Sequence, residues 1–232
     1  MNNDKLSKRL QKVADFVDDG ARLADIGSDH AYLPVNLIKA GKISYAVAGE
    51  VVEGPYQSAK TNVAYEGLTS NINVRLANGL SAVLEEDNID TVVIAGMGGN
   101  LIASILEQGL SKLGKGIKLI LQPNNGEYRL RQWLVKENYK IVSELILEEN
   151  DKIYEIIVAE VVAEVSLSPE ELRFGPILIS EKNPVFRKKW LAELRQKEKI
   201  LENLLSKNLA PDKQDKLKAE ILQIREVLED EG

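Results

Sequence analysis

Cysteine is absent from this sequence of 232 residues, and histidine occurs only once, as His30. The chain therefore has no disulfide, no thiol nucleophile and no cysteine-ligated zinc, and one histidine excludes a multi-histidine metal centre. No run of 18 apolar residues occurs, and the polar N-terminus lacks the apolar core of a signal peptide. We expect a cytoplasmic protein with no metal and no membrane segment.

The composition is 44% hydrophobic and 28% charged, which is typical of a globular protein of one large or two small domains. The net charge of -6 is unevenly distributed. It is -7 over residues 1–180, +5 over residues 181–218 and -4 over residues 219–232. A locally basic block in an acidic protein either faces a polyanion or is the solvated face of a helix.

Short β-branched runs alternate with helical stretches and glycine turns over residues 20–165. Five strand units are followed by two adjacent strands joined by a turn at residues 149–152. Strands are expected at Arg22–Ile26, Tyr45–Gly49, Ile72–Leu76, Thr91–Ala95, Ile117–Leu121, Lys140–Leu147 and Tyr154–Val162. Helices are expected at Leu6–Phe16, Leu33–Ala40, Gly54–Gly67, Asn100–Gln108 and Tyr128–Asn138. This order predicts an α/β fold with a seven-stranded, mostly parallel sheet and one antiparallel strand near an edge, the Rossmann-like methyltransferase layout.

The last part of the chain has a different composition. Residues 185–230 are almost free of glycine and β-branched residues and are rich in leucine, lysine and glutamate. Their apolar positions are spaced three and four apart, with a break at residues 208–212, which predicts two amphipathic helices. We expect an α-helical coiled-coil hairpin in a domain of residues 167–232, after an α/β domain of residues 1–166. A hairpin buries the apolar faces of both helices within one chain and favours a monomer, although self-association would bury them too.

The ends of the first two strands carry candidate ligand-binding residues. Gly27 permits a tight turn and close approach of a ligand, and the next helix begins at the same place. The glycine fingerprint of nicotinamide sites is missing, so pyrophosphate binding is not expected. Asp25 at the strand end suits a ligand with a cationic amino-acid tail, although an ordinary turn is compatible with these residues. Glu50, at the end of the second strand, can accept both hydroxyls of a ribose.

The residues that follow the later strands are expected at the same edge of the sheet, because the carboxyl ends of parallel strands lie together. Asn78-Gly79 is either an amide that contacts an adenine edge or a plain turn. The glycines of Gly96–Gly99 remove side chains from the floor of the crevice where the strand order reverses. The amides of Gln122–Asn125 suit a planar base. His30 either contacts substrate or relays a proton, or else is a helix-capping or solvated histidine.

Four stretches of the chain form a specific combination: LADIGSDHAYLP, AGEVVEGPYQSA, VVIAGMGGNLI and LILQPN. With the basic, leucine-rich C-terminal helices, they resemble the bacterial tRNA (adenine-22-N1)-methyltransferase family, TrmK, over essentially the full chain. The resemblance implies S-adenosyl-L-methionine as cofactor, a class I methyltransferase domain and a C-terminal coiled-coil domain. It also implies tRNA as partner, with N1 of adenine 22 in the D-arm as methyl acceptor.

The resemblance assigns these residues to the cofactor: Asp25, Gly27, Ser28, Glu50, Val51, Asn78, Gly79, Gly96 and Met97. Asp25, Gly27 and Asp29 fall near its methionine part. Glu50 faces the ribose and Val51 the adenine. Asn78 stands where such enzymes often have aspartate, which weakens a charged contact but keeps an acceptor oxygen.

For the substrate, the resemblance places the target base at Gln122, Pro123 and Asn124, although these differ from the usual Asn-Pro-Pro-aromatic motif. The N1 lone pair attacks the sulfonium methyl in line without prior proton loss, so alignment and a nearby carboxylate suffice. Asp29 is the first catalytic candidate, with His30 as hydrogen-bond partner or proton acceptor. Tyr32 either stacks on the unstacked base or packs in its helix. Phosphate contacts are expected from Arg9, Arg187, Lys188, Lys189, Arg195, Lys197 and Lys199.

Two other functions use the same motifs. A methyltransferase acting on a small molecule or protein has the same cleft, with the basic arm as a dimerisation element. A non-catalytic RNA-binding protein with a retained cofactor fold binds tRNA without turnover. A nicotinamide oxidoreductase is disfavoured by the missing glycine fingerprint.

Overall fold

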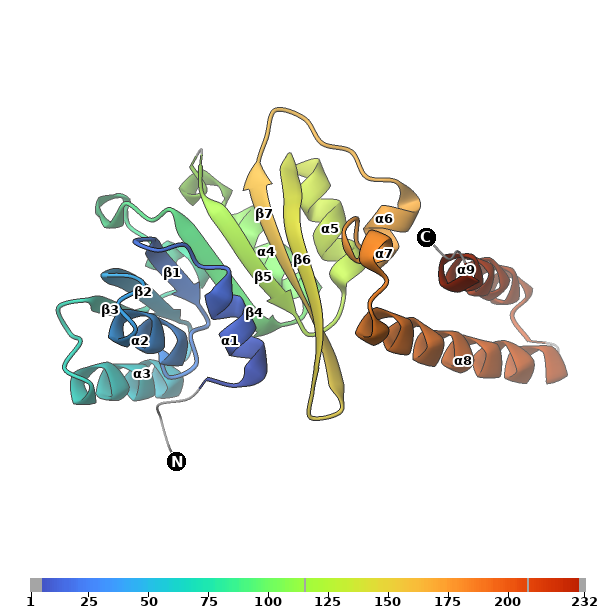
Figure 1. The fold of residues 1–232 in the computed structure, drawn as a ribbon, viewed down its shortest axis with the longest axis horizontal. Coiled ribbons are helices and arrows are strands. Elements are labelled where there is room, and N and C mark those ends of the chain that lie inside the picture. Colours follow the sequence, from blue (N-terminus) through green and yellow to red (C-terminus); the bar gives the residue numbers. More distant parts are fainter. Residues whose placement is uncertain (1–5, 115, 208, 230–232) are drawn as a thin grey trace. The chain divides into compact units, whose positions relative to one another are not determined.

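The computed structural model describes residues 6–114, 116–207 and 209–229. By its internal contacts the chain divides into two compact units, residues 1–166 and residues 167–232. The first unit is built around a β-sheet, and the second is helical in its described part (Figure 1).

Within the described residues of the first unit, seven strands form one sheet in the order β3-β2-β1-β4-β5-β7-β6. Their bounds are β1 Arg22–Ile26, β2 Tyr45–Glu50, β3 Ile72–Leu76, β4 Thr91–Met97, β5 Lys118–Pro123, β6 Tyr139–Glu149 and β7 Lys152–Val161. Neighbours among β1 to β5 pair in parallel, whereas β7 pairs antiparallel with both β5 and β6. The predicted mostly parallel sheet with one antiparallel strand beside an edge is confirmed.

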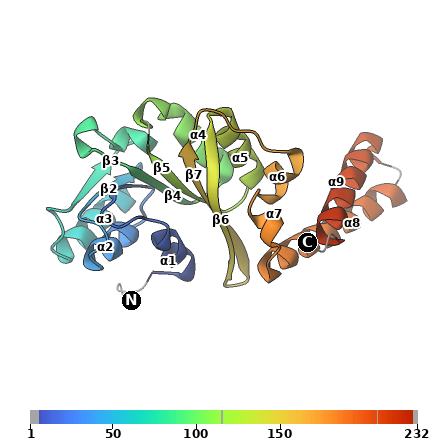
Figure 2. The ribbon, with the colours of Figure 1, turned by 45° about the horizontal axis from the view of Figure 1, so that its top comes forward.

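Helices cover both faces of the sheet. Their bounds are α1 Lys8–Asp15, α2 Tyr32–Lys39, α3 Glu53–Tyr65, α4 Gly99–Gln108 and α5 Glu127–Lys136. The two ribbon views place α1, α2 and α3 on one face and α4 and α5 on the other (Figures 1 and 2). The central strands are therefore buried on both sides, which explains their continuous apolar runs: Leu23, Val93 and Leu119 are each 0% exposed.

The strand order reverses between β1 and β4, and we call the space at the carboxyl ends of these two strands the crevice. From β1 the chain moves outward through β2 and β3, and from β4 it moves the other way through β5. The turns that follow β1 and β4 therefore diverge to opposite faces of the sheet. In open α/β sheets, ligands bind at this point of reversal.

The strand ends differ from the sequence prediction at several places. β2 ends one residue later than predicted, at Glu50, and β5 two residues later, at Pro123. β4 continues past Ala95 to Met97 through an irregularity in its pairing with β5, where Gly96 has a left-handed φ of +80°. β6 and β7 are longer than predicted and are joined by a tight turn, in which Asn150 and Asp151 both have positive φ, 51° and 59°. Such left-handed pairs suit the right-handed twist of a hairpin.

The second unit contains α6 Pro169–Phe174, α7 Leu178–Glu181, α8 Pro184–Ser206 and α9 Pro211–Glu229. The two short helices lie where the sequence predicted only a connection. Ser168 begins α6 with a reciprocal capping box to Glu171, a signal that is visible in the sequence.

The helices α8 and α9 pack antiparallel to each other. Arg187 Nη1 donates to the carbonyl of Leu228 at 3.1 Å, near the start of α8 and the end of α9. Further along α8, Lys197 pairs with Glu220 at 2.7 Å. The predicted helical hairpin is present, and these paired contacts fix the direction of its two helices.

Candidate active site

Backbone hydrogen bonds join the carboxyl ends of the first three strands in the sheet. The N–H of Gly27, just after β1, donates to the carbonyl of Gly49 in β2 at 2.8 Å. The N–H of Ala77, just after β3, donates to the carbonyl of Glu50 at 2.7 Å. The turns that carry the candidate residues are therefore held together by the sheet itself.

We call the residues at and just after the carboxyl ends of the parallel strands the rim. Asp25 is the more deeply buried of its two buried carboxylates, the other being Glu50. The Asp25 side chain is 4% exposed and accepts a hydrogen bond from Ser28 Oγ at 2.5 Å. The pKa of Asp25 is raised to about 7, mainly by burial and to a lesser extent by the charges of Glu50 and Asp29, against the opposing effect of the Ser28 hydrogen bond. Asp25 is therefore partly protonated near neutral pH. A cation bound beside it would favour the ionised carboxylate.

Glu50 is the second carboxylate of the rim. It is 6% exposed, and its Oε1 accepts a hydrogen bond from the backbone N–H of Asp29 at 2.7 Å. Burial raises the pKa of Glu50, and the Asp29 N–H bond opposes that rise. The end of β2 is thus attached to the turn that follows β1.

The turn after β1 has an unusual backbone. Asp29, His30 and Ala31 have consecutive left-handed φ values of 41°, 66° and 58°. Non-glycine residues rarely adopt this conformation, and it occurs at sites where surrounding contacts enforce it. One such contact is the amide of Asn62 in α3, which donates to the carbonyl of His30 at 2.8 Å.

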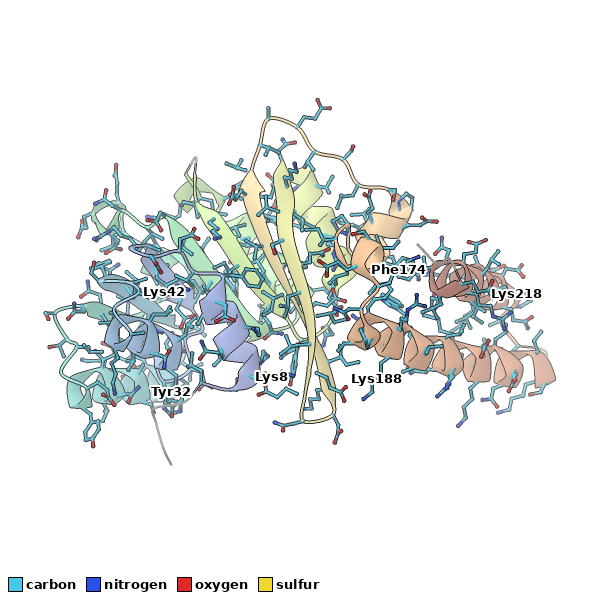
Figure 3. All side chains as sticks on the ribbon, in the orientation of Figure 1. Lys8, Tyr32, Lys42, Phe174, Lys188 and Lys218 are labelled. Carbon is cyan, nitrogen blue, oxygen red and sulfur yellow. The ribbon has the colours of Figure 1, made fainter. Side chains whose placement is uncertain are left out.

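Asp29 and His30 of this turn are accessible to solvent, whereas Ala31 is buried. Asp29 is 86% exposed, and its Oδ1 lies 3.6 Å from His30 Nε2. The His30 ring stacks on Tyr32, with the ring centres 5.2 Å apart. Tyr32 begins α2 and is labelled in Figure 3. A carboxylate, an imidazole and a phenol ring are therefore presented together beside the crevice.

Two of the predicted glycines have a steric reason to be glycine. Gly27 has a φ of +73°, and an added Cβ would lie 2.1 Å from Cε of Met97. Met97 therefore lies against the turn after β1. An added Cβ on Gly99 would lie 2.4 Å from the carbonyl oxygen of Gly126. Gly99 thus serves the packing of α4 against the start of α5, whereas Gly96, which is exposed, leaves the rim open.

The residues after β5 divide into buried and exposed positions. Gln122 is 0% exposed, and its Oε1 accepts from the N–H of Gly96 at 3.0 Å. Its Nε2 donates to the carbonyl of Pro123, which is also buried, at 2.8 Å. Asn124 is exposed and donates through Nδ2 to the carbonyl of Gly96 at 2.7 Å. Gln122 thus supports the glycine turn from behind, and Asn124 is the one of the three that faces solvent.

Arg9 is brought to the same turn from α1. Its Nη1 donates to Gln122 Oε1, and its guanidinium lies 5.4 Å from the centre of the Tyr154 ring. The backbone N–H groups of Lys8 and Arg9 donate to the carboxylate of Glu149 at 2.6 and 3.2 Å. Glu149 ends β6, so the hairpin tip holds the start of α1 in place.

Exposed apolar side chains surround the rim. Val51 is 63% exposed, Leu76 is 47% exposed and Leu101 is 53% exposed, and each lies at the end of a strand or the start of a helix. Asn78 is exposed between them, and Gly79, with a φ of +53°, begins a short 3₁₀ helix, η1 Gly79–Ala82. Apolar groups of this kind suit contact with a planar ring system.

The predicted phosphate-binding residues of α8 differ in their surroundings. Arg195 and Lys199 are exposed, and Lys188 is exposed as well. Lys197 instead pairs with Glu193 at 3.1 Å and with Glu220 at 2.7 Å. Lys189 lies 5.4 Å from the ring of Trp190. The basic block is therefore partly an internal ion-pair network and partly exposed charge.

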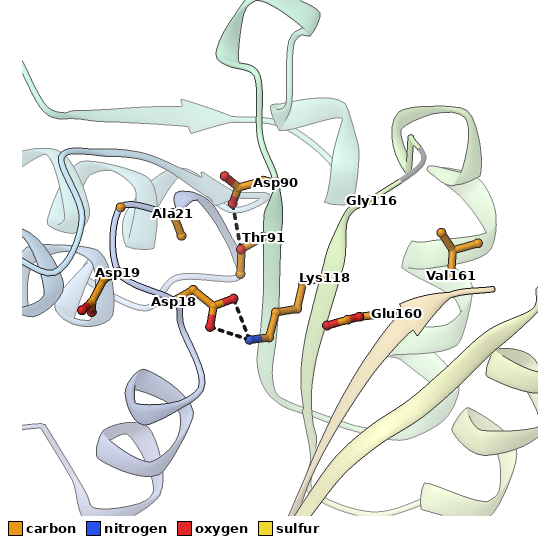
Figure 4. Close-up of a pocket in the computed structure, with 10 residues that line it drawn as sticks. Asp18, Asp19, Ala21, Asp90, Thr91, Gly116, Lys118, Glu160 and Val161 are labelled. Atoms are coloured by element: carbon orange, nitrogen blue, oxygen red, sulfur yellow. Dashed lines mark hydrogen bonds and ion pairs between the residues drawn. The ribbon is translucent and has the colours of Figure 1, made fainter.

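A separate cavity of about 370 Å³ lies at the amino ends of β1, β4 and β5 (Figure 4). Its lining is acidic, but Asp18 pairs with Lys118 at 2.9 Å, and Asp90 accepts from the N–H of Arg22 at 3.1 Å. Among the described residues, no group of three or more His, Cys, Asp or Glu side chains is arranged to hold a metal ion. In the same part of the chain, no helix has the length and apolarity to cross a membrane.

The sheet order and the acidic rim define a Rossmann-like class I methyltransferase. Residues 23–226 match the family model of TrmK, tRNA (adenine(22)-N(1))-methyltransferase. The chain is 49% identical over 210 residues to the Bacillus subtilis protein of that name, with 88% of this chain and 87% of that protein covered. The chain belongs to the TrmK family.

Two solved structures agree with this assignment. The Streptococcus pneumoniae protein Sp1610, in complex with S-adenosyl-L-methionine, is 51% identical with a TM-score of 0.89. That comparison covers 97% of this chain and 100% of the other. TrmK of M. capricolum, in complex with S-adenosyl-homocysteine, is 32% identical with a TM-score of 0.86, covering 97% and 98%.

Several site residues are not evident from the sequence motifs. Asn62, Tyr154 and Glu149 contact the candidate residues only after folding. Asn62 lies 32 residues from His30 in the chain, and Glu149 lies 141 residues from Lys8. No local pattern marks such partners.

Proposed function

We propose that the protein methylates N1 of adenine 22 in tRNA, in the cytoplasm, with S-adenosyl-L-methionine as donor. The observation that carries this proposal is the meeting of Asp25, Asp29 and Glu50 at one rim, opposite the open Gly96 turn. Family membership and the cofactor present in the Streptococcus pneumoniae relative support it.

The rim residues suit the cofactor. Asp25 and Asp29 provide negative charge for its cationic methionine end, next to the backbone that Gly27 leaves uncovered. Glu50 accepts hydrogen bonds from the ribose hydroxyls, and Val51 packs against the adenine. Ser28, which donates to Asp25, keeps that carboxylate oriented.

The remaining contacts complete the same site. Asn78, exposed after β3, accepts a hydrogen bond from the adenine amino group. Gly79, with its left-handed φ of +53°, allows η1 to begin directly after Asn78. Gly96 and Met97 form the opposite wall. The donor supplies an electrophilic methyl group that the N1 lone pair of adenine attacks in line.

Asp29 and His30 carry the chemistry on the protein side. The exposed Asp29 carboxylate stabilises the positive charge that grows on the adenine as N1 is methylated. His30 Nε2, 3.6 Å from Asp29 Oδ1, receives the proton that then leaves the exocyclic amine. The hydrogen bond from Asn62 to the carbonyl of His30 keeps both groups on the strained turn.

The substrate contacts have two parts. Tyr32 stacks on the target base, and Asn124 contacts its edge, while Gln122 and Pro123 hold the turn from behind. Arg9, beside Gly96, provides a cation at the rim. Cations of α8 contact phosphates and set orientation without reading sequence, namely Arg187, Lys188, Lys189 and Arg195. Of these four side chains, Lys188 and Arg195 are exposed, and Arg187 and Lys189 are half-buried.

The test is transfer of labelled methyl to two unmodified tRNA transcripts that differ only in adenine or guanine at position 22. Label on the adenine transcript alone supports the proposal. Label on both refutes the position, and label on neither, with cofactor binding intact, favours a small-molecule or protein substrate. An Asp29→Asn variant should lower the single-turnover rate by about a hundredfold, whereas Asp19→Asn, an exposed carboxylate elsewhere, should leave it unchanged.

A further inference from the structure

A second cavity opens on the flank of the sheet between α2 and α3. Its volume is about 520 Å³. We call it the α2–α3 pocket, and its main lining residues are His30, Tyr32, Gln57, Ser58, Asn62 and Tyr65. The function proposed above uses its His30–Tyr32 edge and the hydrogen bond from Asn62, but gives no role to Gln57, Ser58 and Tyr65 of α3.

The α3 side of the pocket presents an aromatic ring to solvent. Tyr65, the last residue of α3, is 82% exposed, the largest exposure among the exposed large hydrophobic residues of the described chain. On the α2 side, His30 and Tyr32 are already stacked on each other. Aromatic side chains on both sides of an open cavity suit stacking with unpaired bases.

The pocket also offers hydrogen-bonding groups for a base edge. Gln57 Nε2 donates to Glu53 Oε1 at 2.7 Å, and Asn62 Nδ2 donates to the carbonyl of His30 at 2.8 Å. Each of these bonds uses a single N–H and leaves the amide oxygen and the second N–H for another partner. The hydroxyl of Ser58 lies in the same lining. Amides and hydroxyls of this kind pair with nucleobase edges.

The charge of the pocket suits RNA. None of the residues that line it is acidic, although the protein as a whole is, and a carboxylate that contacts the lining on the α3 side, that of Glu53, is bonded to Gln57 at 2.7 Å. Lys60, five residues before Tyr65 on α3, is exposed, and its Nζ lies 5.3 Å from the centre of the Tyr56 ring. A cation next to an aromatic pocket can contact the phosphate of a nucleotide whose base is inside.

The α3 side of the pocket is separate from the place of methyl transfer. Of its lining, only His30 belongs to a turn at a strand end, and the other residues come from α2 and α3. The reacting base must lie in the crevice between the β1 and β4 turns. A base held against the α3 side of the pocket is therefore a different base of the same RNA.

We propose that the α2–α3 pocket binds an unstacked base that flanks the target adenine, with Tyr65 stacking on it. This rests on the proposed function, since it takes the RNA substrate as given. Exposing a paired base for methylation requires unstacking it from its neighbours. A second site that holds a neighbour stabilises the opened RNA and positions the target.

The first experiment compares Tyr65→Ala, Tyr65→Phe and Tyr65→Leu. Because Tyr65 is at a helix end and exposed, all three should fold and bind S-adenosyl-L-methionine as the wild type does, which calorimetry checks. Loss of the ring should raise the KM for tRNA by about tenfold at unchanged kcat. Tyr65→Phe should keep the wild-type KM, whereas Tyr65→Leu should behave like Tyr65→Ala. Equal KM values for all four proteins would overturn the proposal.

The second experiment identifies the base. tRNAs with a single abasic nucleotide at adenine 22 or at one of the positions flanking it are titrated against wild type and Tyr65→Ala. At the position that occupies the pocket, removing the base should weaken wild-type binding by about tenfold and leave the variant unaffected. Additive effects at every flanking position, or coupling only at adenine 22, would contradict a separate flanking site.

The two proposals fail in different ways. A wild-type protein that methylates no tRNA refutes the proposed function. A wild-type protein that methylates adenine 22, together with ring-independent KM values, refutes only the α2–α3 pocket.

Discussion

The carboxylate of Glu50 accepts the backbone N–H of Asp29 at 2.7 Å, and this bond joins the end of β2 to the strained turn after β1. One Glu50 side chain therefore has two tasks in the proposed site. It holds the turn that carries Asp29, and its other oxygen faces the ribose.

Replacing Glu50 separates these tasks. Glu50→Gln keeps an acceptor for the Asp29 N–H but removes the charge that strengthens the ribose contacts. Hydrogen bonds to a charged group contribute about 1.5–3 kcal/mol, so the Kd for S-adenosyl-L-methionine should rise roughly ten- to a hundredfold by calorimetry. Glu86→Gln removes the same charge from an exposed side chain and should leave the Kd unchanged. An unaltered Kd in Glu50→Gln would remove Glu50 from the cofactor site.

Gly27 and Gly20 form a matched pair for testing steric clearance. Both have left-handed φ values, +73° and +80°, but an added Cβ meets Met97 at Gly27 and nothing within 4 Å at Gly20. Gly20→Ala should lower the free energy of unfolding by about 1–2 kcal/mol and leave cofactor binding intact. Gly27→Ala should lose at least as much stability and should also weaken binding, because Met97 must move into the crevice. Denaturant unfolding and cofactor titration of both variants provide the comparison, and equal binding in both would argue against close approach at Gly27.

The raised pKa of Asp25 predicts a pH dependence. Between pH 4 and the folded-state pKa of about 7, the folded protein keeps a proton that the unfolded chain, with a pKa of 3.8, has lost. This contribution to stability is therefore greatest at low pH and declines as pH rises to about 7, by up to about 4 kcal/mol. Relative to Asp25→Asn, wild-type stability should fall between pH 5 and pH 8 in denaturant unfolding. A constant difference would show that Asp25 is not titrating there.

The same group predicts proton release on cofactor binding. A cationic ligand beside Asp25 favours the carboxylate, so affinity should increase with pH up to about 7 and then level off. Calorimetry in two buffers of different ionisation enthalpy measures the released proton directly. Asp25→Asn should abolish both the release and the pH dependence.

Arg195 and Lys197 test which cations of α8 contact RNA. Arg195 is exposed, whereas Lys197 pairs with Glu193 and Glu220. Arg195→Ala should weaken tRNA binding and reduce the slope of log affinity against log salt by about one. Lys197→Ala should instead lower the free energy of unfolding by about 1 kcal/mol with little change in that slope. The reverse outcome would show that the ion-pair network opens to bind RNA.

The strands and the rim could be predicted because their signals are local. A strand buried on both faces has a continuous apolar run, and the residue that follows it lies at the rim whatever the rest of the chain does. The positions of Asp25, Gly27 and Glu50 at the strand ends follow from such signals. α6 was missed, although the Ser168–Glu171 capping box was visible.

Contacts between distant residues could not be predicted in the same way. Gln122 appears in the sequence as an amide at a strand end, free to contact a base. In the structure it is buried between Gly96 and Arg9, which lies 113 residues earlier in the chain. Burial of this kind depends on the register between β4 and β5 and on where α1 docks, and neither is contained in a local pattern.

The link from Glu149 to Lys8 and Arg9 has a consequence for the order in which the enzyme is completed. Synthesis proceeds from the N-terminus, so α1 leaves the ribosome long before the hairpin tip that caps it. Until Glu149 emerges, the first turn of α1 lacks this carboxylate and Arg9 lacks its final position. A nascent chain truncated before β6 would carry every rim residue from Asp25 to Asn124 and still have an unfinished active site.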